Sequence, residues 1–151
     1  MKWVTRQRAM VDRIACPWLI RRFIDPEAVF LYVPADRVLA VAKETGAIPF
    51  DAPGADLHHF AEEGQEFVSF DAILRHYRLS DPALTELARI VRVADGGSGT
   101  SPEGAGLAAA ADGFRRIAAD DFENQRLQFP LYDALYAWCR ARLESKADAR
   151  P

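Results

Sequence analysis

Short apolar runs alternate with helical patterns in the first part of the chain. Lys2–Thr5, Val29–Val33 and Ile48–Phe50 are rich in β-branched and aromatic residues, which favours strands. The continuous run Val29–Val33 is typical of a strand buried on both faces. Ala35–Thr45 has apolar residues at helical spacing and precedes Gly46, a common helix stop. A strand, a helix and a strand of this length predict a right-handed crossover and parallel pairing.

Helices are expected along much of the remaining chain. Pro17 is tolerated in a first helical turn, so a helix is predicted from near Cys16 to Ile24. Ser69 can cap one later helix, and Ser80-Asp81-Pro82 can begin another. These later helices are predicted over Phe70–Tyr77, Pro82–Val93, Pro102–Ala119 and Asp121–Leu143, with a kink at Pro130 in the last one. The irregular stretch 51–65 has one expected strand, over Leu57–Phe60.

Together these patterns predict the α/β class: a small, partly parallel sheet covered by about five helices. One domain is expected over residues 1–145, followed by a flexible polar tail over residues 146–151. The Gly-rich segment 95–101 is interpreted as an exposed connection within this domain, because the residues after it lack strand signals and could not easily fold alone.

Composition narrows the classes of function. The 151 residues carry a formal net charge of −3 and no basic stripe, so direct nucleic-acid binding is not expected. No apolar run approaches the ~20 residues of a membrane span, and charges interrupt the N-terminal segment, so a cytoplasmic protein without membrane contact is predicted. The two cysteines, Cys16 and Cys139, are too few for a disulfide framework and are expected to be free thiols.

The string around Cys16 is the first candidate site. A cysteine just before a helix feels the helix dipole, which lowers a thiol pKa, so Cys16 and Asp12 are candidate catalytic residues. Arg13 and Arg22 are candidate substrate-binding residues because guanidinium groups suit planar oxyanions, and Trp18 is assigned to the same site. The alternative is that Cys16 is a small core residue.

The adjacent histidines His58 and His59 form the second candidate site. In a strand, neighbouring side chains point to opposite faces, so only one of the two is expected to be a ligand. The spacing matches no zinc finger or HExxH motif. A metal would need carboxylates from distant segments, and the candidates are Asp71, Asp95, Asp120 and Asp121. Such a mixed set suits Mn, Fe or Zn. The alternative is two loop histidines among surface charges.

The segment Tyr132–Cys139 has aromatic residues at helical spacing, which is typical of a core stripe. Asp133 is its charged member. A charged group in an apolar neighbourhood needs a partner. We therefore expect Arg13 or Arg22 to form a buried or half-buried ion pair with Asp133, or with Asp12 or Asp71.

The unusual string Asp12–Asp25, together with Ile48–Asp51, His59, Ser69–Asp71 and Tyr132–Cys139, resembles the C-terminal domain of ChrB-type chromate-resistance proteins. The resemblance runs from about Trp3 to Arg140. It implies a bacterial role in oxyanion or metal stress. Full-length members carry an additional N-terminal region and are described as regulators that accompany a chromate efflux pump. The family pattern also places a histidine at His59, which favours His59 over His58 as a metal ligand.

Three functions remain open from the sequence. The first is a domain that senses or binds a small anion such as chromate through its arginines. The second is a small metal-dependent enzyme that uses His59 and carboxylates, and the third is a thiol redox protein that uses Cys16. The ligand site is expected where the Asp12–Arg22 segment, the His58–Asp71 segment and the Asp95 loop converge, beyond the strand ends. A homodimer is a possible assembly.

Overall fold

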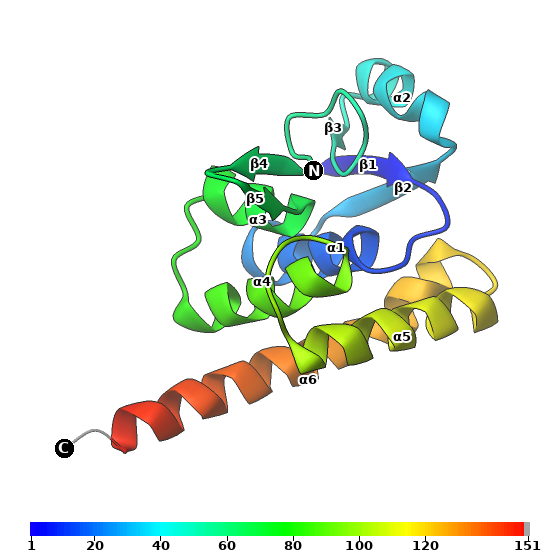
Figure 1. Cartoon of the computed structure of the whole chain (residues 1–151). Helices are drawn as coiled ribbons and strands as arrows, with labels where there is room; N and C mark the ends of the chain where they lie inside the picture. Colours follow the sequence, from blue (N-terminus) through cyan, green and yellow to red (C-terminus); the bar gives the residue numbers. More distant parts are fainter. Residues whose placement is uncertain (150–151) are drawn as a thin grey trace.

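A three-stranded parallel sheet of order β2-β1-β3 organises the N-terminal part of the protein. The computed structural model describes residues 1–149 (Figure 1). The strands are β1 (Lys2–Arg6), β2 (Val29–Val33) and β3 (Ile48–Pro49). The predicted parallel pairing and the α/β class are confirmed. Because β2 is an edge strand, only its Phe30 is buried, and the expected burial of both faces of this run is wrong.

Alternation along the central strand β1 divides the interior into two clusters. Trp3 faces the larger cluster, which contains α1 (Asp12–Phe23), whereas Val4 faces a smaller one with Val38 of α2 (Val38–Thr45). Figure 1 shows α1 and α2 on opposite sides of the sheet. The short 3-10 helix η1 (Ala35–Arg37) precedes α2, which ends at Gly46 as predicted.

Helix α1 begins four residues earlier than the sequence suggested. Pro17 lies inside this helix and has no N–H to donate to the carbonyl of Arg13. The hydroxyl of Tyr32 donates to that carbonyl instead, at 2.9 Å. A side chain from β2 therefore compensates for the missing helical hydrogen bond, and Cys16 lies within the helix and not at its start.

A short hairpin and two helices follow the sheet. Strands β4 (Phe60–Glu62) and β5 (Gln65–Phe67) pair antiparallel and lead into α3 (Ser69–His76) and α4 (Pro82–Ala94). Residues 57–60 do not form the expected strand: Leu57 makes an isolated bridge to Phe50, His58 and His59 are unpaired, and Phe60 already begins β4. The predicted start of α4 is confirmed: the Asp81 carboxylate accepts from the N–H of Ala83.

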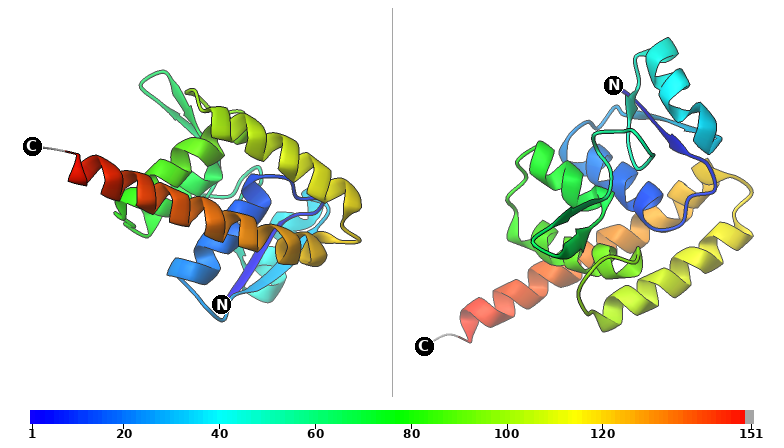
Figure 2. Two further views of the ribbon diagram at one scale, coloured as in Figure 1. Left: turned by 90° about the horizontal axis from the view of Figure 1, so that it is seen from below. Right: turned by 45° about the horizontal axis from the view of Figure 1, so that its top comes forward.

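Two helices complete the fold, α5 (Pro102–Ile117) and α6 (Asp121–Asp148). Helix α6 runs along α1, α4 and α5 and projects beyond them at its C-terminal end (Figure 2). Its Tyr132 and Tyr136 pack on Trp18, so the predicted core stripe is confirmed. The helix continues through Pro130 and past the expected end at Leu143, and the tail residues 150–151 lie outside the described residues.

No helix within residues 1–149 combines the length and the apolarity that crossing a membrane requires.

Candidate metal centre

Four side chains lie close together, each at or near a boundary of an element. Asp12 begins α1, Asp51 follows β3, His59 precedes β4 and Asp95 follows α4. The Nε2 atom of His59 lies 3.0 Å from Oδ2 of Asp95, 3.2 Å from Oδ1 of Asp51 and 3.4 Å from Oδ2 of Asp12. Three carboxylates therefore surround a single imidazole nitrogen.

The carboxylate of Asp12 is fixed by the first turn of α3. Its oxygens accept hydrogen bonds from the backbone N–H groups of Ser69, at 2.7 Å, and Phe70, at 3.1 Å. The thiol of Cys16 also donates to it. Burial raises the pKa of Asp12 to about 7, although its hydrogen bond with His59 acts in the opposite direction. The backbone thus positions a buried carboxylate next to the imidazole of His59.

Asp51 is neutralised from its other side. Arg6 and Arg13 approach its carboxylate at 3.2 and 3.3 Å, and the hydroxyl of Ser69 donates to it at 2.7 Å. Burial raises the pKa of Asp51, but the hydrogen bonds with His59 and Ser69 and the two guanidinium charges outweigh it and hold the pKa well below its usual range. Asp51 adopts a left-handed φ of 47°, which acidic residues tolerate better than most.

Asp95 is held by the loop that leaves α4. Gly96 has φ of 88°, and the N–H groups of Gly97 and Ser98 donate to the carbonyls of Arg92 and Glu66. The carboxylate of Asp95 follows the last turn of its helix, where the dipole is negative. This position disfavours an anion unless a cation lies beside it, and His59 is the cationic group in contact with it.

Hydrogen bonds with Asp12, Asp51 and Asp95 raise the pKa of His59 to about 12, so the free protein holds an imidazolium there. A ring nitrogen carries only one hydrogen, and one hydrogen cannot satisfy three carboxylates. The N···O separations of 3.0–3.4 Å are also those between neighbouring ligand atoms around an ion with bonds of about 2.1 Å. Asp12, His59 and Asp95 each offer a ligand atom within 4.8 Å of the others.

A cavity of about 400 Å³ opens beside His59 and is also lined by His58 and His76, so it gathers all three histidines of the chain. The rings of His58 and His59 lie side by side, with centroids 5.2 Å apart. They do not point to opposite faces as expected, because neither residue is in a strand. Nδ1 of His58 is buried without a hydrogen-bond partner among residues 1–149.

Three residues of the first candidate site, the one predicted around Cys16, do not take the roles predicted for them. Cys16 is completely buried within α1, and burial followed by the charge of Asp12 raises its thiol pKa, which is the reverse of an activated thiolate. Trp18 is buried in the core, where its Nε1–H donates to Asp133 at 2.7 Å. Arg22 pairs with the same Asp133. The predicted pair Arg22–Asp133 thus exists, but it is exposed, and the partner of Arg13 is Asp51.

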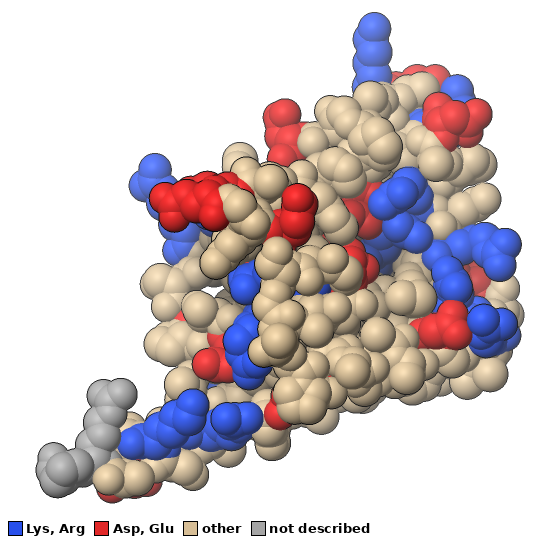
Figure 3. Space-filling view, in the orientation of Figure 1, with Lys and Arg blue, Asp and Glu red and all other residues tan. Residues whose placement is uncertain are grey.

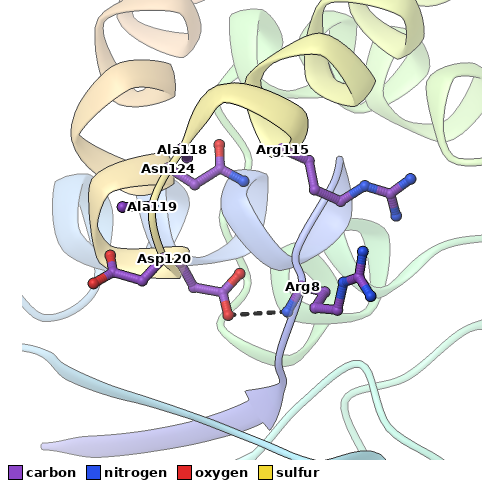
Figure 4. Close-up of a pocket in the computed structure, with 7 residues that line it drawn as sticks. Arg8, Arg115, Ala118, Ala119, Asp120 and Asn124 are labelled. Atoms are coloured by element: carbon purple, nitrogen blue, oxygen red, sulfur yellow. Dashed lines mark hydrogen bonds between the residues drawn. The ribbon is translucent and has the colours of Figure 1, made fainter.

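Two predicted carboxylate ligands are not at His59. Asp71 accepts from the N–H of Val68 and pairs with Arg92 through both oxygens, at 2.6 and 3.0 Å. Asp120 caps α6 by accepting from the N–H of Glu123. Asp120 lines a separate pocket with Arg8 and Arg115 (Figure 4), where the neighbouring Asp121 accepts from the Arg8 N–H. On the surface, Lys and Arg side chains gather over this side of the molecule, at the α5–α6 connection, whereas acidic ones gather over the β4–β5 hairpin (Figure 3).

The structure therefore brings Asp12, Arg13, His59 and Asp95 together, at the predicted meeting point of their segments. Asp51 was missed as a site residue. Its signal was its place directly after a parallel strand, where ligand sites of α/β proteins commonly form.

Comparisons with known proteins agree with the resemblance noted in the sequence. The family model of the ChrB C-terminal domain matches residues 3–139. Protein ChrB of Cupriavidus metallidurans is 37% identical over 137 residues, which cover 89% of this chain but 40% of that relative. No solved structure matches. The chain thus spans less than half of the relative, and it belongs to the family of ChrB C-terminal domains.

Proposed function

We propose that this domain serves chromate resistance by binding one divalent transition metal ion through Asp12, His59 and Asp95. The convergence of three carboxylates on one imidazole nitrogen supports this proposal most directly. Mixed imidazole and carboxylate donors suit Mn, Fe and Zn. The backbone hydrogen bonds to Asp12 provide the orientation that ligands usually receive from the surrounding protein.

A metal ion at this position would also define how an oxyanion binds. Arg13 is committed to Asp51 and Arg22 to Asp133, so neither guanidinium is free to hold an anion directly. The carboxylates themselves repel anions. Three protein ligands leave coordination positions open, as in catalytic metal sites. His59 and Asp95 are partly exposed, which gives such a position access to solvent, so we infer that an oxyanion such as chromate reaches the domain as a ligand of the metal.

This arrangement favours metal-dependent binding or catalysis over thiol chemistry. Cys16 is buried, and its sulfur faces a carboxylate. Cys139, the second cysteine, is buried in α6, and the two form no disulfide.

Metal content of single histidine variants tests the proposal. Elemental analysis of the purified protein, and titration of chelator-treated protein with Mn²⁺, Fe²⁺ and Zn²⁺, should give about one ion per chain. His59→Ala should lose this ion, whereas His76→Ala is a matched control from the same cavity and should retain it. His58→Ala distinguishes the two adjacent rings, and we expect it to retain the ion.

Equal metal retention in His59→Ala and wild type would refute the proposed centre. If only His58→Ala loses the metal ion, the ligand is His58 and not His59. Chromate titration tests the second inference. Binding by the metal-loaded protein but not by the metal-free protein would support chromate as a ligand of the metal, and equal binding by both would contradict it.

A further inference from the structure

A third cavity, of about 420 Å³, lies between α3 and α4, and its lining is mainly basic, whereas the candidate metal centre is acidic. Three of its lining residues are arginines, namely Arg75, Arg78 and Arg92, and its one acidic side chain is Asp71. Asp71 is fully engaged by Arg92 and by the N–H of Val68. The cavity therefore carries an excess of positive charge in a protein whose net charge is negative.

The arginines differ in how they are neutralised. Arg75 pairs with Glu62, but both side chains are more than half exposed, and exposed pairs contribute little. No acidic side chain among residues 1–149 pairs with Arg78. Its backbone has φ of 53°, a conformation that non-glycine residues rarely adopt. Arg78 is thus an exposed arginine at the cavity without an acidic partner among these residues, and the ion pair of Arg75 beside it is also exposed.

The remaining walls are apolar or carry hydroxyl groups. Phe67, Leu74 and Leu79 line the cavity with Ala88, and the guanidinium of Arg92 stands 4.9 Å from the ring centre of Phe67. Ser80 and Thr85 add hydroxyl groups. The volume lies within the range of about 300–1,000 Å³ for small-molecule sites, and it exceeds what one inorganic oxyanion would fill.

We propose that this cavity, between α3 and α4, binds a small organic anion whose charged group pairs with Arg78 and Arg75 and whose apolar body packs on Phe67, Leu74 and Leu79. Asp12, His59 and Asp95 are not among its lining residues, although Arg75 also lines the cavity beside His59. It does not depend on the metal proposal.

Three probes separate charge from apolar contact in a calorimetric titration: phenyl phosphate has both features, inorganic phosphate only the charge, and phenol only the ring. Phenyl phosphate should bind about tenfold more tightly than inorganic phosphate, and phenol should not bind measurably. Equal binding of the two phosphates would overturn the proposed apolar contact, and absence of phenyl phosphate binding would overturn the site.

Variants then locate the binding. Arg78→Gln should weaken phenyl phosphate binding about tenfold, because a charge-assisted hydrogen bond is lost. Arg75→Gln gives a second measurement, which is compared with His59→Ala because Arg75 also lines the cavity beside His59. Arg89→Gln is the matched control, since Arg89 lies on α4 with Arg92 but outside the cavity. His59→Ala should leave the binding unchanged. Unchanged binding in both cavity variants, or loss in His59→Ala, would place the anion elsewhere.

Discussion

The thiol of Cys16 donates a hydrogen bond to Oδ1 of Asp12 at 3.3 Å, in the interior of the protein. This contact connects Cys16, a candidate reactive thiol in the sequence, with a carboxylate of the proposed metal centre. The charge of Asp12 opposes a thiolate, and burial opposes it more strongly, so the pKa of Cys16 is raised. The contact therefore orients the carboxylate and leaves the sulfur inert.

We predict that Cys16 does not react with Ellman's reagent in the native protein at pH 8. Cys139→Ser isolates Cys16 for this measurement, and Cys16→Ser isolates Cys139, which is equally buried. Both thiols should be modified only as fast as the protein unfolds, because the reagent reacts with exposed thiolates. Rapid modification of native Cys16, well ahead of Cys139, would restore the activated-thiol hypothesis.

Arg13 and Arg22 should differ in their effect on stability. Arg13→Ala leaves the buried carboxylate of Asp51 short of one counter-charge, so we expect it to lower the free energy of unfolding by about 3 kcal/mol. Arg22→Ala removes an exposed pair with Asp133 and should cost less than about 1 kcal/mol. Urea denaturation of the metal-free proteins measures both. Similar losses in the two variants would show that burial does not determine the strength of these pairs.

Replacement of Gly97 should disturb the position of Asp95. A Cβ at Gly97 would lie 2.6 Å from Cγ of Arg92 and 2.9 Å from the carbonyl oxygen of Glu66, so the loop after α4 must shift. We expect Gly97→Ala to weaken metal binding by about tenfold, the lower range for lost orientation of a ligand. Gly106→Ala is the control, since a Cβ there meets no atom within 4 Å. Undiminished affinity in Gly97→Ala would remove Asp95 from the centre.

Metal affinity should increase with pH. In the free protein the three carboxylates raise the pKa of His59 to about 12, so a metal ion must displace a proton from Nε2. The apparent affinity should therefore rise about tenfold per pH unit between pH 7 and 9, with one proton released for each ion bound. Below pH 7 the slope should steepen, because burial raises the pKa of Asp12 to about 7 and this carboxyl also takes up a proton.

Calorimetry in buffers of different ionisation enthalpy counts the released protons. A pH-independent affinity between pH 7 and 9 would show that Nε2 of His59 is not a ligand.

Helix ends that depend on a single local residue were predicted correctly from the sequence. Gly46 ends α2 and Asp81 caps α4 because each acts on its own helix end. The start of α1 was wrong because Tyr32, on a distant strand, replaces the hydrogen bond that Pro17 cannot make. A hydrogen bond between residues so far apart in the sequence cannot be predicted from local residue patterns.

The candidate site shows the same division. The meeting of the Asp12, His59 and Asp95 segments followed from element ends and from the family resemblance. Asp71 was misplaced because its partner, Arg92, lies on another helix, one turn before Asp95. The prediction that His58 and His59 point to opposite faces was wrong because it assumed a strand that does not form there.

Helix α6 supplies no residue of the proposed metal centre, yet it packs on the helix that carries Asp12. Asn124 donates to the carbonyl of Ala9, and Tyr132 donates to that of Val11, on the segment that enters α1. Two aromatic side chains that contact Trp18 of α1, Tyr132 and Tyr136, also belong to α6. Loss of α6 would therefore remove hydrogen bonds that hold the segment entering α1, and with it Asp12 at the proposed centre.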